Sequence, residues 1–176
     1  MEPAELEERL KTLHAESFSW ALTCCGGNVA DAEDVLQTVY LHILQGKARF
    51  GGHAEFKTWL FSVIRNRAAK EMRRQMVRRI FLLRPERTRT FPQSVPLPDA
   101  SLEGTEQEDA FEQAIDALPS RQREVLHLVF YDDLTLDAAA QVMGISPGAA
   151  RRHYERGKKK LRRDFQERKT AHEQGR

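Results

Sequence analysis

The chain has 176 residues and a mass of 20.3 kDa, which suffices for one domain of ordinary size or two small ones. Charged residues make up 31% and hydrophobic residues 40%, enough to build small helical cores, and a mean hydropathy of −0.60 argues against membrane residence. The cysteines, Cys24 and Cys25, are adjacent and so rarely close an unstrained disulfide, and the acidic start has no apolar signal core. These features exclude disulfide-rich secreted proteins and predict a cytoplasmic protein without membrane insertion.

The net charge of +2 hides four blocks of alternating sign. Residues 31–34 are acidic, residues 65–89 carry +8, residues 99–116 carry −7 and residues 151–169 carry +7. Two basic segments separated by an acidic one indicate two contacts with a polyanion. Charge alone favours solvated helix faces over such contacts, so the motifs must decide between these interpretations.

The first half of the chain is predicted to form a small helical domain over residues 1–83. Apolar residues at helical spacing predict a helix over 3–24, a second that starts near Asp31, and a third over about 54–77. The acids of the second helix lie in its first turn, where the helix dipole favours them. The third helix is expected to bury Phe56, Trp59, Leu60, Val63 and Ile64 and to expose its bases.

The next segment is predicted to be a flexible linker over residues 84–104, because prolines and a glycine interrupt it and it shows no hydrophobic period. A second helical domain is expected over 105–176. Its first helix is predicted over 105–118 and stopped by Pro119, and Ser120 is expected to cap the next helix.

The most informative pattern of the second half is a short helix over 134–143, a glycine turn at Gly144, and a basic helix with Ser146 as its N-cap and Pro147 at its first position. This order is typical of a helix-turn-helix that binds duplex DNA. Ala150 and Tyr154 are expected to face inward. Outward long side chains would then read base edges, and lysines would contact phosphates. The candidates are Ser146, Arg151, Arg152, Glu155, Arg156, Lys158 and Lys159. A helical hairpin with a solvated basic face is the alternative.

Two further constellations carry weaker signals. Aromatic residues precede a basic run, an arrangement that suits single-stranded nucleic acid, although the aromatics alone are more typical of a core. The candidates are Trp59, Arg65, Asn66, Lys70, Arg73 and Arg74. The acidic start of the second predicted helix is either a set of dipole partners or a docking surface for a basic protein. Its candidates are Asp31, Glu33, Asp34, Gln37 and Tyr40.

Nothing in the sequence indicates catalysis. The six histidines have no metal-ligand spacing, and there is no phosphate-binding glycine loop and no nucleophile elbow. We therefore expect no metal, no cofactor and no enzymatic activity. The two cysteines lie at a predicted helix end and are interpreted as structural rather than redox-sensing.

Two blocks of the chain resemble those of a known family. The motifs within residues 15–80 are similar to region two of the extracytoplasmic-function sigma factors: Asp31-Ala-Glu-Asp-Val-Leu-Gln37, Phe50-Gly-Gly, Phe56-Lys-Thr-Trp-Leu60 and Ile64-Arg-Asn-Arg-Ala68. The motifs within residues 108–165 resemble region four: Ala117-Leu-Pro-Ser-Arg-Gln-Arg-Glu-Val-Leu126, Leu134-Thr135 and Gly144-Ile-Ser146. Both blocks occur in the family's order, with a linker between them.

The resemblance implies an all-α fold with a region 2 bundle, a region 4 helix-turn-helix and a flexible linker. It implies a transcription initiation factor that binds core RNA polymerase and directs it to promoter DNA. The acidic helix would dock on the polymerase, the basic helix after Trp59 and the loop that follows it would open and read the minus-ten element, and the helix after Ser146 would read the minus-35 element. Many members are held by an anti-sigma factor, which is a further expected partner.

Two other functions remain open at this point. A helix-turn-helix regulator that acts without polymerase would explain residues 134–163 but would leave the first basic block unused. An adaptor that binds a protein through its acidic helix would not touch DNA at all.

Overall fold

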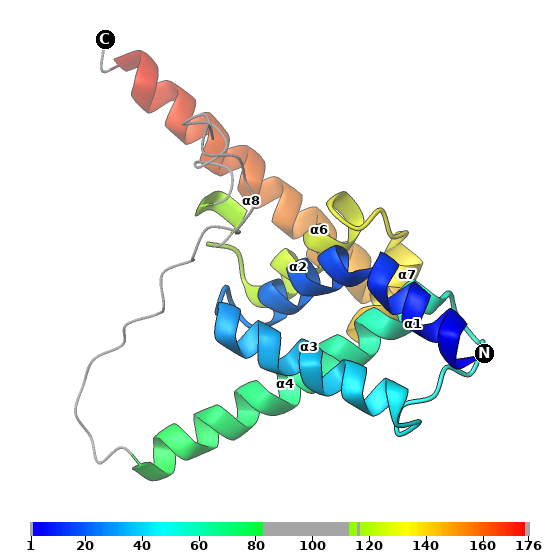
Figure 1. Ribbon diagram of the computed structural model, residues 1–176. Coiled ribbons are helices and arrows are strands. Elements are labelled where there is room, and N and C mark those ends of the chain that lie inside the picture. Colours follow the sequence, from blue (N-terminus) through cyan, green and yellow to red (C-terminus); the bar gives the residue numbers. More distant parts are fainter. Residues whose placement is uncertain (1, 83–112, 116, 175–176) are drawn as a thin grey trace. The chain divides into compact units, whose positions relative to one another are not determined.

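The computed structural model describes residues 2–82, 113–115 and 117–174, and the regular secondary structure of these residues is helical throughout (Figure 1). The expected all-α fold is therefore confirmed. The chain divides into two compact units, Met1–Val95 and Pro96–Arg176. The predicted linker over 84–104 and most of the predicted helix over 105–118 lie outside the described residues.

The first unit begins with two helices where the sequence predicted one. α1 spans Pro3–Thr12 and α2 spans His14–Cys24, with Leu13 between them at φ −92° and ψ 9°. The amide of Leu13 still donates to the Arg9 carbonyl at 3.2 Å, so the break is a kink rather than a loop. α1 contacts both α2 and the third helix, and its Leu10 is buried. Tertiary packing of Leu10 therefore overrides the continuous helical pattern.

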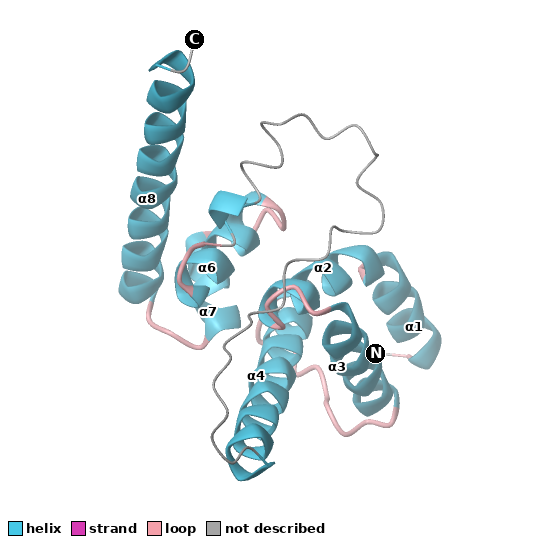
Figure 2. Cartoon of the chain, turned by 90° about the vertical axis from the view of Figure 1, so that its left-hand side faces the viewer, coloured by secondary structure: helices cyan, strands magenta, loops and turns pink. Residues whose placement is uncertain are grey.

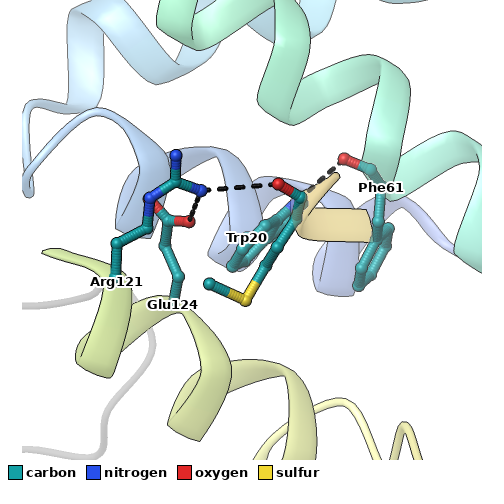
Figure 3. A network of polar contacts seen from close by, with 5 residues as sticks. Trp20, Phe61, Arg121 and Glu124 are labelled. Atoms are coloured by element: carbon teal, nitrogen blue, oxygen red, sulfur yellow. Dashed lines mark hydrogen bonds and ion pairs between the residues drawn. The ribbon is translucent and has the colours of Figure 1, made fainter. Parts of the chain in front are cut away.

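The core of the first unit lies where α2 packs against α3, Val29–Leu44, and α4, Phe56–Leu82. Trp20 and Phe61 have no exposed surface, and their stacked rings lie 6.0 Å apart. The Trp20 indole Nε1 also donates a hydrogen bond to the Phe61 carbonyl at 3.0 Å (Figure 3). A buried indole needs such a partner, so this bond fixes α2 against α4.

α3 begins earlier than its acidic residues suggested. Asn28 is the N-cap, and its side chain accepts a hydrogen bond from the Asp31 amide at 3.0 Å. The buried residues of α3 recur at helical spacing: Ala32, Val35, Leu36, Val39 and Ile43. This stripe packs inward and leaves the opposite side of α3 in solvent.

α4 is longer than predicted, and its end projects beyond α2 and α3 (Figure 1). Phe56, Leu60 and Ile64 are buried as expected, whereas Trp59 and Val63 are only half-buried. Large apolar side chains near the projecting end are exposed: Met76 by 65%, Val77 by 51%, Ile80 by 66% and Phe81 by 85%. The spacing of apolar residues in the sequence did not predict this exposed end.

The second unit packs α6, Ser120–Phe130, α7, Leu136–Met143, and α8, Pro147–Gln174, so that each contacts the other two. α8 extends well past α6 and α7 (Figure 2). The prediction that Ser120 caps α6 is wrong. Pro119 occupies the cap position without a side-chain bond, and Ser120 is the first helical residue, because the proline already has the extended backbone a cap requires.

Gly157 lies where α8 meets α6. A Cβ atom at this position would lie 2.8 Å from Leu126 Cδ1 and 3.4 Å from Gln122 Cβ. Leu126 is itself 1% exposed, so it has little room to move away. Glycine therefore allows a close approach of the two helices that outweighs its poor helix propensity.

Candidate functional site

The predicted docking residues of α3 divide into two groups. Glu33, Asp34 and Gln37 are exposed on the side opposite the buried stripe. Asp31 is half-buried, and its Oδ1 accepts a hydrogen bond from Gln75 Nε2 of α4 at 2.7 Å. Tyr40 is also half-buried, with its hydroxyl 3.3 Å from His14 Nδ1. Burial raises the pKa of Tyr40, and Ser17 opposes that shift. Asp31 and Tyr40 thus already have partners within the unit.

The outward side of α3 also carries apolar residues that the sequence analysis missed. Leu41 and Leu44 are 51% and 52% exposed. They follow Gln37 at intervals of four and three residues, so they continue the line of Glu33 and Asp34 along the helix. The signal was available, because neither leucine is in phase with the buried stripe. A surface with acidic residues next to exposed apolar residues is suited to binding a protein partner.

The basic face of α4 assembles most of the predicted single-strand contacts. Asn66, Lys70, Arg73 and Arg74 are exposed, and their spacing places them on one side of the helix. Arg65 is half-buried and lies to the side of this face. Arg73 Nε donates a hydrogen bond to the Ala69 carbonyl of the same helix at 3.3 Å. This contact therefore does not draw the Arg73 side chain toward another helix.

Trp59 lies at the start of the same face, seven residues before Asn66. Its ring lies 5.4 Å from each of the Phe50 and Phe56 rings, and it is half-buried. This cluster joins the loop before α4 to the first turn of α4. One side of the indole is thus used for packing, while part of its surface stays accessible at the end of the basic face.

The helix-turn-helix prediction corresponds to α7 and α8. The Thr135 hydroxyl caps α7 by accepting from the Ala138 amide at 3.1 Å, so α7 begins at Leu136 rather than at the predicted Leu134. Gly144 ends α7 with φ +61°, the left-handed conformation that glycine adopts without steric cost. Ser146 Oγ accepts from the Ala149 amide at 3.3 Å and so caps α8, as predicted. The Ser146 oxygen is thereby used in folding, and its hydroxyl proton remains a donor.

The outward face of α8 presents the predicted readout residues. Arg151, Arg152, Glu155 and Arg156 are exposed, whereas Ala150 is fully buried. Tyr154 is half-buried and stacks on Phe130 of α6 at 5.9 Å. The first two turns of α8 therefore have a packed side and a charged side, which is the geometry that groove recognition requires.

The lysines of α8 differ in what they contact. Lys159 is exposed, while Lys158 is half-buried, with its ammonium 4.8 Å from the Tyr154 ring centre and 3.9 Å from the Glu155 carboxylate. Lys160 donates to the Ala117 carbonyl at 2.7 Å. Of these three, Lys159 is the best placed to contact a phosphate without giving up a contact within the unit.

An apolar groove of about 700 Å³ lies beside α6 and α8. Leu126, Phe130, Leu161 and Phe165 line it, together with the basic residues Lys158 and Arg162. Phe130 and Phe165 are 57% and 36% exposed. The groove was not predicted, because it forms only where two helices distant in the sequence pack side by side.

The described part of the chain contains neither a candidate membrane span nor a candidate metal site. None of its helices could span a lipid bilayer. Its histidine, cysteine and acidic side chains form no group of three or more that could hold a metal ion.

The cysteines differ in their surroundings. Cys25 is buried, and desolvation, aided by Asp31 and Glu71, raises the pKa of its thiol from 9.0 to about 12. Cys24 is half-buried, and neither residue forms a disulfide.

A Cys24→Ser variant leaves Cys25 as the only thiol. At pH 8 we expect Cys25 to react with iodoacetamide at least about 100-fold more slowly in the folded chain than in denaturant, because the thiolate is the reactive form. Mass spectrometry of timed samples measures the rates, and equal rates would contradict the buried thiol. Because the unfolded thiol ionises near 9.0, this group adds no pH dependence below pH 9, and it makes the first unit less stable as the pH rises from 9.0 to about 12.

Comparisons with known proteins identify the family. Residues 11–78 match the model of Sigma-70 region 2, and residues 108–161 match that of Sigma-70, region 4. RNA polymerase sigma factor CarQ of Myxococcus xanthus is 30% identical over 157 residues, which cover 88% of this chain and 86% of that protein. ECF RNA polymerase sigma factor EcfG of Rhodopseudomonas palustris (strain TIE-1) is 30% identical over 77% of this chain and 71% of that protein. The chain belongs to the extracytoplasmic-function sigma factors.

This sigma factor therefore binds core RNA polymerase and directs it to promoter DNA for transcription initiation. The interpretation as a regulator that acts without polymerase is not favoured. ECF RNA polymerase sigma factor SigW of Bacillus subtilis (strain 168) is a further relative, 26% identical over 80% of this chain and 79% of that protein.

Solved structures share the fold of this sigma factor. The sigma factor RpoE, solved in complex with the anti-sigma factor NepR from Bartonella quintana, superposes with a TM-score of 0.70 at 20% identity, covering 92% of this chain and 97% of that chain. CnrH, solved with the cytosolic domain of CnrY, has a TM-score of 0.56 at 18% identity, covering 90% of this chain and 86% of that chain.

Proposed function

We propose that this sigma factor divides promoter recognition between two basic helical faces, one for each unit. The face of α4 would hold unpaired bases of the minus-ten element, and the face of α8 would read the duplex minus-35 element. The observation that supports this division most directly is that one helix of each unit, α4 in the first and α8 in the second, carries several exposed bases on one side. The residues at 84–104 would act as the linker between the two units.

The α4 face has the chemistry that single-stranded DNA requires. Lys70, Arg73 and Arg74 supply cations for phosphates, and Asn66 supplies an amide that can pair with a base edge. Trp59 offers an aromatic surface at the start of the face. Binding of unpaired bases here would lower the free-energy cost of opening the promoter.

The test of the whole proposal is transcription from genomic fragments with purified core polymerase. We expect transcripts from specific start sites only when this sigma factor is added. A chain that bound core polymerase but gave no specific transcript from any fragment would contradict the proposed promoter recognition.

Arg151→Ala should reduce discrimination at a single minus-35 base pair by about 1–3 kcal/mol, because an arginine that forks onto a guanine distinguishes it from other bases. Lys159→Ala should weaken binding about equally on all sequences and reduce the salt slope by about one. Holoenzyme binding to the selected promoter and to its single-base variants, at several salt concentrations, measures both effects. Equal effects of the two substitutions would contradict the separation of readout from phosphate contact.

The outward side of α3 is proposed to dock on core polymerase, through the exposed Glu33, Asp34 and Gln37 and the adjoining Leu41 and Leu44. Asp31 and Tyr40 would support this surface through their contacts with Gln75 and His14, rather than contact polymerase freely.

Asp34→Arg should weaken binding to core polymerase by about tenfold, since a reversed charge at an interface repels the basic partner. Glu7→Arg is the matched control, because Glu7 is an exposed acid on α1 rather than on α3. Fluorescence titration of labelled protein with core enzyme measures the affinity. A similar loss for both variants would show that net charge, and not this surface, governs docking.

Three further properties complete the proposal. The protein acts in the cytoplasm, where core polymerase is found, and it has no catalytic activity of its own. An anti-sigma factor is a proposed regulator, since RpoE was solved in complex with the anti-sigma factor NepR. The apolar groove beside α6 and α8 offers a surface for a protein partner.

A further inference from the structure

The C-terminal end of α7 is held by a residue of another helix. The last carbonyls of a helix lack intrahelical partners and need donors from elsewhere. The Ile145 amide donates to the Ala140 carbonyl and the Gly144 amide to the Gln141 carbonyl, both at 3.1 Å. The Met143 carbonyl, the last of α7, accepts from Arg121 Nη1 of α6 at 3.4 Å (Figure 3).

Arg121 is itself oriented by a neighbour. Its Nη1 lies 3.9 Å from Glu124 Oε2, one turn further along α6, and the Glu124 side chain is only 14% exposed. Figure 3 shows the Arg121 guanidinium beside the Glu124 carboxylate. The positive charge also lies at the negative end of the α7 dipole, where a cation is favoured. The contact therefore combines a charge-assisted hydrogen bond with a favourable dipole interaction.

Only three residues, Gly144, Ile145 and Ser146, separate α7 from α8. A turn this short transmits a displacement of the end of α7 directly to the first turn of α8. That first turn is followed at once by the exposed Arg151 and Arg152. Small errors in the placement of such side chains are costly, because hydrogen bonds to base edges depend on distance and angle.

We propose that Arg121 is a positioning residue for minus-35 recognition. It fixes the carbonyl end of α7 and so sets the orientation in which α8 presents its readout side chains. Arg121 does not read a base itself. The inference rests on the proposed reading of the minus-35 element by α8, and it assigns a role to a residue that lies outside the helix-turn-helix.

Two other roles for Arg121 predict different results. Its side chain is 44% exposed, so it could instead contact a DNA phosphate. Loss of a phosphate contact would weaken all sequences equally and reduce the salt slope by about one. A purely stabilising role would lower the unfolding temperature of the second unit and leave sequence discrimination unchanged.

The experiment uses holoenzyme assembled from the full chain and core polymerase. The probes are a promoter fragment selected by the wild-type holoenzyme and a set of fragments with single substitutions through its minus-35 element. Arg121→Ala should reduce discrimination by about fivefold at every position that α8 reads, the effect expected from one hydrogen bond of ordinary strength. Arg151→Ala should reduce it at one position only. Arg121→Lys, which keeps a charged donor, should restore most of the discrimination.

The outcomes separate the possibilities. A loss across all positions with an unchanged salt slope, restored by lysine, supports the proposal. A reduced salt slope with unchanged discrimination, or a lower unfolding temperature alone, overturns it. Should Arg121→Ala fail to fold, Glu124→Gln provides a milder change that releases the guanidinium and should produce a smaller loss of the same kind. If Arg151→Ala also leaves discrimination unchanged, the proposed reading by α8 fails, and the role of Arg121 fails with it.

Discussion

Replacing Gly157 by leucine should destabilise the second unit by about 3 kcal/mol, the upper part of the usual range for overpacking a core. A Cβ atom alone would already lie 2.8 Å from Leu126 Cδ1, and a full side chain would push α8 away from α6. The unfolding midpoint of that unit should fall by more than about 10 °C. Transcription that depends on the minus-35 element should be lost with it, because α8 would no longer be held in place.

The chain offers a direct way to measure this effect. Both tryptophans, Trp20 and Trp59, lie in the first unit, so tryptophan fluorescence follows that unit alone, while far-ultraviolet circular dichroism follows the helices of both. The circular dichroism midpoint of Gly157→Leu should fall while the fluorescence midpoint stays fixed. Gly148→Leu is the matched control, since nothing lies within 4 Å of a Cβ atom at Gly148. An unchanged circular dichroism midpoint in Gly157→Leu would contradict the close approach of the helices.

Asp132→Ala should destabilise the second unit by about 3 kcal/mol, the upper part of the range for removing one partner of a buried polar contact. Asp132 is 3% exposed, and its Oδ2 lies 3.3 Å from Nε2 of His127, which is 8% exposed. The Asp132 amide also bonds the His127 carbonyl at 3.3 Å, so the residue holds the turn that connects α6 to α7. The same comparison of circular dichroism with tryptophan fluorescence measures the change.

The neighbouring aspartate provides a control of opposite sign. Asp133 is exposed and has φ +55°, a left-handed conformation that is unfavourable for a residue with a side chain. Asp133→Gly should therefore stabilise the second unit by about 1 kcal/mol. If both substitutions destabilised the unit equally, loss of negative charge in this turn, and not the buried contact, would be the cause.

Local signals explain why the helix-turn-helix could be predicted from the sequence. Gly144, Ser146 and Pro147 act on the backbone within a few residues of themselves, so their identities suffice to place the turn and the start of α8. The inward side of α8 also followed from spacing, since Ala150 is buried while Arg151 and Arg152 are exposed. Resemblance to the sigma factors, and not periodicity, supplied the partners and the two promoter elements.

Contacts between distant residues explain what the sequence did not predict. The kink at Leu13 depends on packing of α1 against α3, and the bond between Gln75 and Asp31 depends on residues 44 positions apart. Lys160 has a cationic side chain that could contact a phosphate, yet its ammonium group donates to the Ala117 carbonyl. The closeness of Gly157 to Leu126 likewise arises only when α8 packs against α6.

The projecting end of α4 bears on how the protein behaves before it finds a partner. Met76, Val77, Ile80 and Phe81 leave between 51% and 85% of their surface in water. Apolar surface gathered in this way promotes self-association as concentration rises. The free protein should consequently stay monomeric longest at low concentration. Purification should yield more of it when a binding partner that covers that helix end is co-expressed. In a cell, the same property would favour a small pool of unbound molecules and rapid clearance of any excess.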